Sequence, residues 1–344
     1  MNATIISNDA KHYPVLLDEI LSIISPQNGG TFIDCTFGQG EYSKAILKFP
    51  NTKILALDRD PESEKYITQI KSTYSNRFFF HNLKFGNLNK LDLQKEKIRT
   101  IIFDLGFSYN QIKDLKRGLS FSSQGELDMR MGLNNFSASD VVNNLDQKDL
   151  EIIFKTFGEE KDSKKIAKKI IIQRKKNKID TQELVRIINS SKKKNNKKIH
   201  NATKIFQALR IFVNKEISEL VNGLINSVKI LDKNGILILV SFHSLEDKII
   251  KTFFKLLSEN KKISRYVPDN TSKPKILNLV KKKPILPSDK EVKTNKPSRS
   301  AKLRYAIKIK EPGNFEEEVY DKFKHFLNIE KLSEKLWRNI FYQL

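Results

Sequence analysis

Short apolar runs, each followed by a turn and a helical pattern, dominate the first third of the chain. The first run, Thr31–Thr36, follows a Gly-Gly pair and leads into Gly38 and Gly40. From Glu41 the apolar positions recur with helical spacing, and Pro50 ends the pattern. Similar runs predict strands at residues 53–57, 77–80 and 99–104. This alternation predicts an open α/β sheet with parallel strands.

The alternation stops at about residue 111. Up to residue 203 the pattern predicts only helices, at 149–157, 162–175 and 181–188. One long helix is then expected from near Thr203 to about Leu231. The remaining expectations are a buried strand at 236–242, a helix at 244–257, a long and partly mobile segment at 260–298, a strand at 302–309 and a helical tail at 316–344. The sheet is therefore interrupted by a helical insertion.

The glycine loop indicates a nucleoside ligand when it is considered with the second strand. That strand ends in Asp58, twenty residues after Gly38. An acidic residue at this place suits hydrogen bonding to ribose hydroxyls. The third glycine of a dinucleotide fingerprint is absent, because position 43 is Ser. A cofactor without a pyrophosphate, such as S-adenosylmethionine, suits such a loop, although a loop of this kind also fits a plain strand-to-helix turn.

Charge adds a prediction about the binding partner. The chain has 344 residues and a net charge of +23. Residues 161–204 have a net charge of +13 and residues 273–310 a net charge of +11, which leaves about −1 for the rest. An A+T-rich genome also favours lysine, but that bias would spread lysines evenly. Two basic blocks on a near-neutral body predict surfaces for a polyanion, and we expect nucleic acid.

Cysteine, histidine and hydropathy exclude several classes of protein. The single cysteine, Cys35, excludes an internal disulfide and fits a reducing cytoplasm. The five histidines lack metal-site spacing, so no metal is expected. The first residues lack a basic-then-apolar pattern, so we expect no signal sequence, and the longest apolar run, Ile236–Val240, is too short to cross a membrane.

Several motifs together resemble one family, the bacterial 16S ribosomal RNA cytosine-N4 methyltransferases, also called MraW or RsmH. The LDMRM and SFHSLED strings have no generic structural reason to accompany a glycine loop. The matching residues are His12, 14–19 (PVLLDE), 34–40 (DCTFGQG) with Ser43, 56–60 (ALDRD), 104–106 (DLG) with Ser108 and Gln111, 117–118 (RG), 120–121 (SF), 127–131 (LDMRM), 158–160 (GEE), 206–211 (FQALRI), 213–214 (VN), 241–247 (SFHSLED), Pro297 and 299–304 (RSAKLR).

The resemblance implies a Rossmann-like class I S-adenosylmethionine-dependent methyltransferase of the α/β class, interrupted by an inserted helical domain. We expect a discontinuous methyltransferase domain at 1–110 and 204–310, a substrate-recognition insertion at 111–203 and a C-terminal tail at 311–344. The implied partner is 16S ribosomal RNA or the 30S subunit, in the cytoplasm, with no membrane. The implied cofactor residues are Gly40, Glu41, Tyr42, Asp58, Phe85, Asp104 and Gln111.

This chain departs from the family pattern in places. Members usually have Gly-His where Glu41-Tyr42 stand here, which matters only if the His side chain binds the ligand. Asn110 replaces a usual Pro, and the tail after about Glu311 is longer than is typical.

The acceptor chemistry points to the end of the fourth strand. A cytosine amine is a weak nucleophile, and a group that accepts a hydrogen bond from its N–H would make the nitrogen lone pair more nucleophilic. Asp104, the Leu105 carbonyl and Ser108 are candidates, of which we assign catalytic roles to Asp104 and Ser108. Phe107 stands where a stacking aromatic is expected, and His243 is a candidate for the pocket wall. Methylation at cytosine carbon 5 requires a cysteine nucleophile, and Cys35 is placed wrongly for that role.

Three other functions stay open from the residues alone. A DNA amino-methyltransferase would share the fold, although the insertion and the two strings disfavour it. A cofactor-free RNA-binding or assembly protein is conceivable because of Glu41-Tyr42. A nicotinamide-dependent dehydrogenase is disfavoured by the missing glycine and the basic blocks. The oligomeric state, monomer or homodimer, is not fixed by the sequence.

Overall fold

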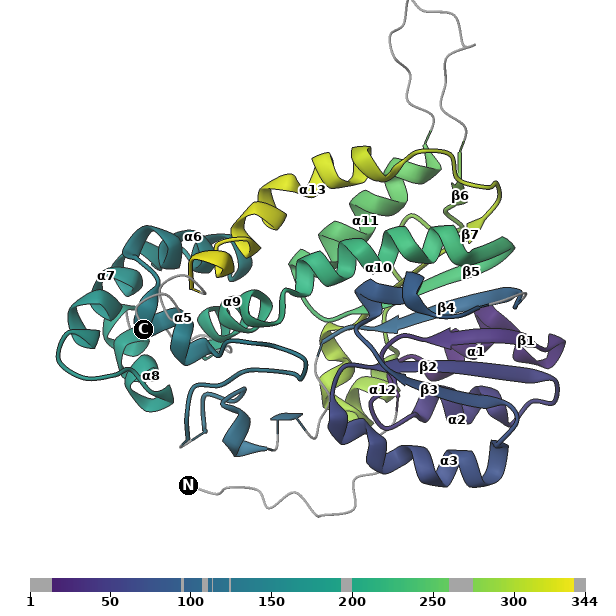
Figure 1. Ribbon diagram of the computed structural model, residues 1–344, viewed down its shortest axis with the longest axis horizontal. Coiled ribbons are helices and arrows are strands. Elements are labelled where there is room, and N and C mark those ends of the chain that lie inside the picture. Colours follow the sequence, from purple (N-terminus) through teal and green to yellow (C-terminus); the bar gives the residue numbers. More distant parts are fainter. Residues whose placement is uncertain are drawn as a thin grey trace, which may run out of the picture.

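A seven-stranded sheet forms the centre of the molecule (Figure 1). The structure is a computed structural model that describes residues 14–93, 96–106, 111–112, 114–123, 125–192, 200–259 and 275–336. The strand order is β3-β2-β1-β4-β5-β7-β6, and only β6 and β7 run antiparallel to their neighbours. The strands are β1 (Gly30–Asp34), β2 (Thr52–Asp58), β3 (Phe78–Asn82), β4 (Ile98–Asp104), β5 (Leu231–Ser241), β6 (Leu277–Asn278) and β7 (Lys302–Lys308).

Helices cover both faces of the sheet because alternate strand residues point to opposite sides. Phe32 of β1 lies in a core with α1 (Leu17–Ile24), α2 (Glu41–Leu47) and α3 (Ile67–Tyr74). The next residue, Ile33, lies in the core on the other face, where α10 (Glu216–Ile230) and α11 (Ser244–Ser258) pack. A strand buried on both faces reads as a continuous apolar run, which explains why β1, β2 and β4 were predictable.

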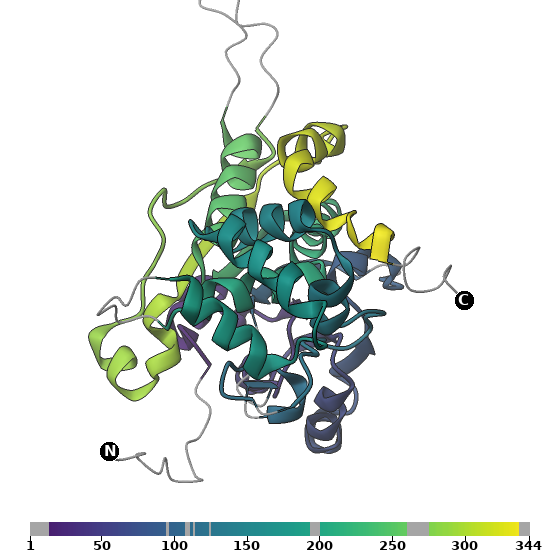
Figure 2. The same cartoon turned by 90° about the vertical axis from the view of Figure 1, so that its left-hand side faces the viewer.

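The insertion is helical, as the sequence predicts. Within the described part of residues 111–203 no strand occurs. Its helices lie beside the sheet, on the left in Figure 1, and form a compact group in the orthogonal view of Figure 2. Their apolar faces join the core that contains α10, so the insertion is continuous with that core. The helices are α5 (Ala138–Asn144), α6 (Gln147–Phe157), α7 (Ser163–Arg174) and α8 (Thr181–Ser191).

Two sequence expectations are wrong in detail. The long helix expected from Thr203 to Leu231 is two helices, α9 (Thr203–Asn214) and α10, because Lys215 adopts a left-handed conformation with φ 50°. The segment expected to be partly mobile at 260–298 contains β6 and α12 (Asp289–Thr294). Glu291 of α12 accepts a hydrogen bond of 2.9 Å from the backbone N–H of Leu16, which fixes this segment to the start of α1. Residues 260–274 lie outside the described part.

The tail forms α13 (Glu316–Glu330), which runs along α10 and reaches α6 of the insertion (Figure 1). The Glu330 carboxylate accepts hydrogen bonds from the backbone N–H groups of Ile217 and Ser218, at 2.9 and 2.8 Å. Farther on, Lys335 forms an ion pair of 2.9 Å with Asp149. The predicted tail helix is therefore confirmed up to residue 330, and it connects the sheet side of the molecule with the insertion.

Candidate active site

Three aspartates end three neighbouring strands at one edge of the sheet. Asp34 ends β1 and lies beside Ala56 of β2 and Ile102 of β4. Asp58 and Asp104 therefore follow two residues later, on either side of Asp34. In a parallel sheet the carboxyl ends of the strands share one edge, and ligands bind there. The structure thus brings Asp58 and Asp104, each predicted at the end of a strand, to the same edge.

The glycine loop lies over this edge. Gly38 donates its backbone N–H to Asp58 Oδ2 at 2.7 Å. Gly40 has φ 77° and precedes α2, and a Cβ at this position would lie 2.5 Å from a ring carbon of Phe37. A Cβ on Gly38 would meet nothing closer than the Thr36 carbonyl oxygen at 3.9 Å. Gly40 is therefore required by packing and conformation, whereas the space above Gly38 is open.

Asp58 is tied to the chain that follows it. Its Oδ1 accepts the backbone N–H of Asp60 at 2.8 Å. Asp60 in turn accepts a hydrogen bond of 2.7 Å from Gln111 and forms an ion pair of 2.6 Å with Arg117. Gln111, expected from the sequence at the cofactor, thus lies beside the Asp58 turn and fastens the start of the insertion to it.

The side chains of the remaining cofactor candidates are oriented in different ways. Tyr42 is buried, and its hydroxyl donates to the Val15 carbonyl at 2.5 Å. Glu41 pairs with Lys44 at 2.8 Å in the first turn of α2. Phe85 packs edge-to-face on Phe103 with ring centroids 5.3 Å apart and stays partly exposed. Contact between a ligand and Tyr42 would therefore use the backbone, while Phe85 keeps part of its ring available.

Acidic side chains gather at this edge, and burial raises their pKa values. Burial raises the pKa of Asp34 to about 6, and the charge of Asp58 adds to this shift. Burial also raises the pKa of Asp104 to about 8, and the groups that raise it further are the acids Asp34 and Glu246. Asp104 Oδ1 is buried, and no described residue donates a hydrogen bond to it. Such an edge suits a cationic ligand and disfavours a pyrophosphate.

A second polar cluster stands beside the edge, after β5. His243 Nε2 lies 3.1 Å from Glu246 Oε1, although the angle does not fit a hydrogen bond. Although burial alone would raise the pKa of Glu246, His243 lowers it. Ligand atoms of Glu216, His243 and Glu246 lie within 4.8 Å of one another, a spacing that a metal ion could use. Arg210 already forms an ion pair with Glu216 at 2.8 Å, so this cluster has its own cation.

The sequence reasoning missed part of this arrangement. Asp34 was recognised only within a motif, yet its carboxyl accepts from Ser43 Oγ at 2.6 Å and its charge acts on Asp104. Asp60 was likewise not assigned a role, although it fastens Gln111. The available signal was position, because Asp34 lies near the end of one predicted strand and Asp60 lies two residues after Asp58, which ends the next. Ser108 and Phe107 lie outside the described residues.

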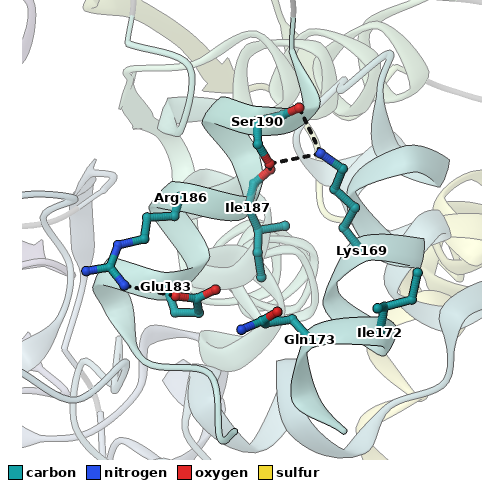
Figure 3. A pocket seen from close by; sticks show the side chains of 7 residues that line it. All are labelled: Lys169, Ile172, Gln173, Glu183, Arg186, Ile187 and Ser190. Carbon is teal, nitrogen blue, oxygen red and sulfur yellow. Dashed lines mark hydrogen bonds and ion pairs between the residues drawn. The ribbon is translucent and has the colours of Figure 1, made fainter. Parts of the chain in front are cut away.

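A hollow of about 260 Å³ lies elsewhere, between α7 and α8 of the insertion (Figure 3). Apolar side chains of Ile172 and Ile187 form part of its wall, and Lys169 donates to the Ser190 hydroxyl and carbonyl oxygens at its rim. None of the residues predicted from the sequence lines it. It therefore does not contribute to the site at the sheet edge.

One more observation concerns the membrane. In the portion of the chain that the structure describes, no helix has the length and apolar character needed to span a bilayer.

Comparison with known proteins identifies the family. The chain is 44% identical over 302 residues to "Ribosomal RNA small subunit methyltransferase H" of Rickettsia akari, covering 87% of this chain and 98% of that protein. It is 43% identical to the protein of the same name from Rickettsia bellii, covering 87% and 99%. A putative rRNA methylase structure from Clostridium thermocellum matches with a TM-score of 0.37 and 11% identity, covering 88% and 100%, which is too low to support an argument. The family model described as "MraW methylase family" matches residues 9–309, and the chain belongs to that family.

Proposed function

We propose that this methyltransferase transfers the methyl group of S-adenosylmethionine to the N4 amine of a cytosine in 16S ribosomal RNA. Members of its family use S-adenosylmethionine. The observation that carries the proposal is the acidic strand edge, where Asp34, Asp58 and Asp104 meet on a chain of net charge +23. The relatives named small-subunit ribosomal RNA methyltransferases support the substrate class.

The residues present fit this cofactor. S-adenosylmethionine brings a methyl group on a cationic sulfonium, together with a ribose that offers two hydroxyl donors. Asp58 retains lone pairs for those hydroxyls, since each of its carboxylate oxygens accepts one backbone N–H. Gly40 and the backbone of Glu41 and Tyr42 would border the cofactor, and Phe85 would cover the adenine. Gln111 would close this side of the site through Asp60.

Asp104 is the group that we assign to the acceptor amine. Bound S-adenosylmethionine would supply the methyl group, whose carbon would bond to the N4 lone pair while the electron pair of its former bond would stay on sulfur. An N4 proton then has to leave, and Asp104 Oδ1 is a buried acceptor without a described donor. In the free protein its pKa of about 8 keeps the carboxyl protonated at neutral pH. A cationic ligand beside it lowers that pKa and makes the carboxylate available. Ser108 and the Leu105 carbonyl remain the other candidates.

The basic blocks would hold the RNA across this edge. We assign residues 161–204 and 273–310 to phosphate contacts and place the enzyme in the cytoplasm, on 30S subunits. The target base has to be splayed out to reach the edge. In this scheme the methyltransferase domain comprises 1–110 and 204–310, the substrate insertion 111–203 and the tail 311–344, and no metal takes part.

Methyl transfer measured on two substrates tests the proposal. We expect the protein to methylate 30S subunits that lack the modification, and mass mapping of 16S ribosomal RNA to place one methyl group on a decoding-region cytosine. Asp104→Asn should slow transfer by about 10²- to 10⁴-fold, the usual contribution of a general base. Activity on duplex DNA alone would favour the DNA amino-methyltransferase. No binding of S-adenosylmethionine in calorimetry would leave only the RNA-binding protein.

A further inference from the structure

Two aromatic rings from distant parts of the chain stack on the surface of the insertion. The rings of Phe121 and His200 lie 4.1 Å apart at an interplanar angle of 9°. Phe206 of α9 supports Phe121 edge-on at 6.3 Å. Phe121 is nevertheless 37% exposed, and His200 is exposed as well. Because much of their surface stays in contact with water, the two rings add little to the free energy of folding.

The pair is held in place by its neighbours. His200 Nδ1 accepts the backbone N–H of Ala202 at 3.2 Å, which orients the imidazole just before α9. The segment that leads to Phe121 is fastened by Arg117, which forms ion pairs with Asp60 and Asp114. Because both rings are oriented before any ligand arrives, stacking on them would cost little conformational entropy.

The helix α9 connects this pair with the strand edge. Phe206 and Arg210 stand four residues apart, so they share one face of α9 and are separated by about 6 Å along its axis. Arg210 binds Glu216 through two hydrogen bonds of 2.8 and 2.9 Å. Glu216 in turn lies beside Glu246, whose charge acts on Asp104. Phe206, which supports the aromatic pair, therefore lies one helical turn from Arg210, which binds the polar cluster beside the site.

The surroundings of the pair favour an anionic ligand. His200 belongs to the basic block at residues 161–204, which has a net charge of +13. Lys204, four residues after His200, is exposed and donates to the Glu159 carbonyl oxygen at 2.8 Å. Exposed aromatic rings among cations are the combination that binds unpaired nucleotides, since bases stack on the rings and phosphates pair with the cations.

We propose that Phe121 and His200 form a stacking platform for an unpaired base of the RNA substrate next to the cytosine that is methylated. This proposal rests on the RNA substrate proposed above. The base stacks on the aromatic pair while its backbone passes the exposed Lys204, and the neighbouring cytosine reaches the strand edge. The platform thereby sets which nucleotide is presented to Asp104.

Paired variants separate stacking from folding. His200→Asn keeps an acceptor for the Ala202 N–H but removes the ring, whereas His200→Phe keeps a ring and loses the acceptor. Phe121→Leu keeps apolar volume beside Phe206 without an aromatic face. Binding to 30S subunits should weaken about 5- to 100-fold for His200→Asn and for Phe121→Leu. His200→Phe should bind within about twofold of the wild type, and S-adenosylmethionine affinity and the melting temperature should be unchanged in all three.

A second readout reports the stack directly. We would place 2-aminopurine beside the target cytosine in a single-stranded RNA of the decoding region, where stacking quenches its fluorescence. Quenching by the wild type that is lost in Phe121→Leu supports the platform. Equal quenching by both proteins, or equal binding of all variants to 30S subunits, would overturn it. Ring-dependent quenching without cytosine methylation would instead reject the proposed function and retain the platform.

Discussion

Asp58 has both carboxylate oxygens bonded to the backbone of the turn that it shapes. Burial raises its pKa, but the N–H groups of Asp60 and Gly38 oppose this shift and favour the charged form. A hydrogen-bond acceptor at the end of β2 is therefore available for ribose hydroxyls. The role of Asp58 can be tested with a variant that cannot ionise but keeps the shape of the side chain.

Asp58→Asn should weaken S-adenosylmethionine binding about 10- to 100-fold, because hydrogen bonds to a charged acceptor are stronger than those to an amide. Isothermal titration calorimetry measures the dissociation constant. The control is Glu62→Gln, which removes an exposed carboxylate that forms an ion pair with Lys65. Equal affinities for wild type and Asp58→Asn would remove Asp58 from the cofactor site.

Asp104 provides a prediction about pH. A carboxyl whose pKa rises from 3.8 to about 8 on folding binds its proton more tightly in the folded state. Its contribution to stability is therefore largest at low pH and declines as the pH rises through this range. The Asp104→Asn side chain cannot ionise, so the variant does not lose this contribution as the pH rises. Without cofactor, the melting temperature of the variant minus that of the wild type should therefore increase by about 5 °C or more between pH 5 and pH 9.

Calorimetric melting at both pH values checks this prediction. The control is Asp321→Asn, at an exposed position of α13. Buried acids that do not act on Asp104, such as Glu330, affect wild type and variant alike and cancel in the difference. A difference in melting temperature that does not depend on pH would show that Asp104 titrates normally.

At the scale of elements, the sequence predicts those helices and strands whose positions follow from the local pattern of apolar residues. Strands buried on both faces are continuous apolar runs, so β1, β2 and β4 were located to within a residue or two. The break at Lys215 was not predictable, because no Gly or Pro marks it. It depends on tertiary contacts: Asn214 donates to the Met129 carbonyl and accepts from the Met131 N–H, both at 2.9 Å. These bonds also give the LDMRM string a structural role.

The same limit applies to the candidate site. Asp58 and Asp104 could be proposed because each directly follows a strand pattern. The link from Asp60 to Gln111 and Arg117 joins residues more than fifty positions apart, so no local spacing reveals it. Gln111 was predicted only through the resemblance to a family. The structure adds the hydrogen bond from Gln111 to Asp60 that holds it in place.

The tail helix α13 lies beyond residue 309, where the family match ends. Glu330 at its end caps α10, and burial raises the pKa of this carboxyl to about 7. Glu330→Ala would leave the N–H groups of Ile217 and Ser218 without their acceptor, at a cost of about 1–3 kcal/mol in the free energy of unfolding. Urea titration measures this loss. Glu334→Ala, four residues later and exposed, should change stability by less than about 0.5 kcal/mol.

At the scale of the whole molecule, an acidic ligand edge lies within a strongly basic chain. Residues 161–204 have a net charge of +13, and α7 exposes Lys164, Lys165 and Lys168 there. Coulomb attraction to RNA releases counterions, so the logarithm of the binding constant falls linearly with the logarithm of salt concentration. The slope reports how many phosphates the protein neutralises.

Replacing these three lysines by glutamine should make the salt slope for binding to 30S subunits shallower by roughly 2 to 3, if each contacts one phosphate. Filter binding at several salt concentrations gives the slope, and S-adenosylmethionine affinity should not change because the edge is untouched. The matched control replaces Lys322, Lys324 and Lys331, which are exposed on or next to α13 and outside both basic blocks. Equal slopes for both triple variants would mean that charge acts over the whole surface, and the assignment of α7 to the RNA interface would be wrong.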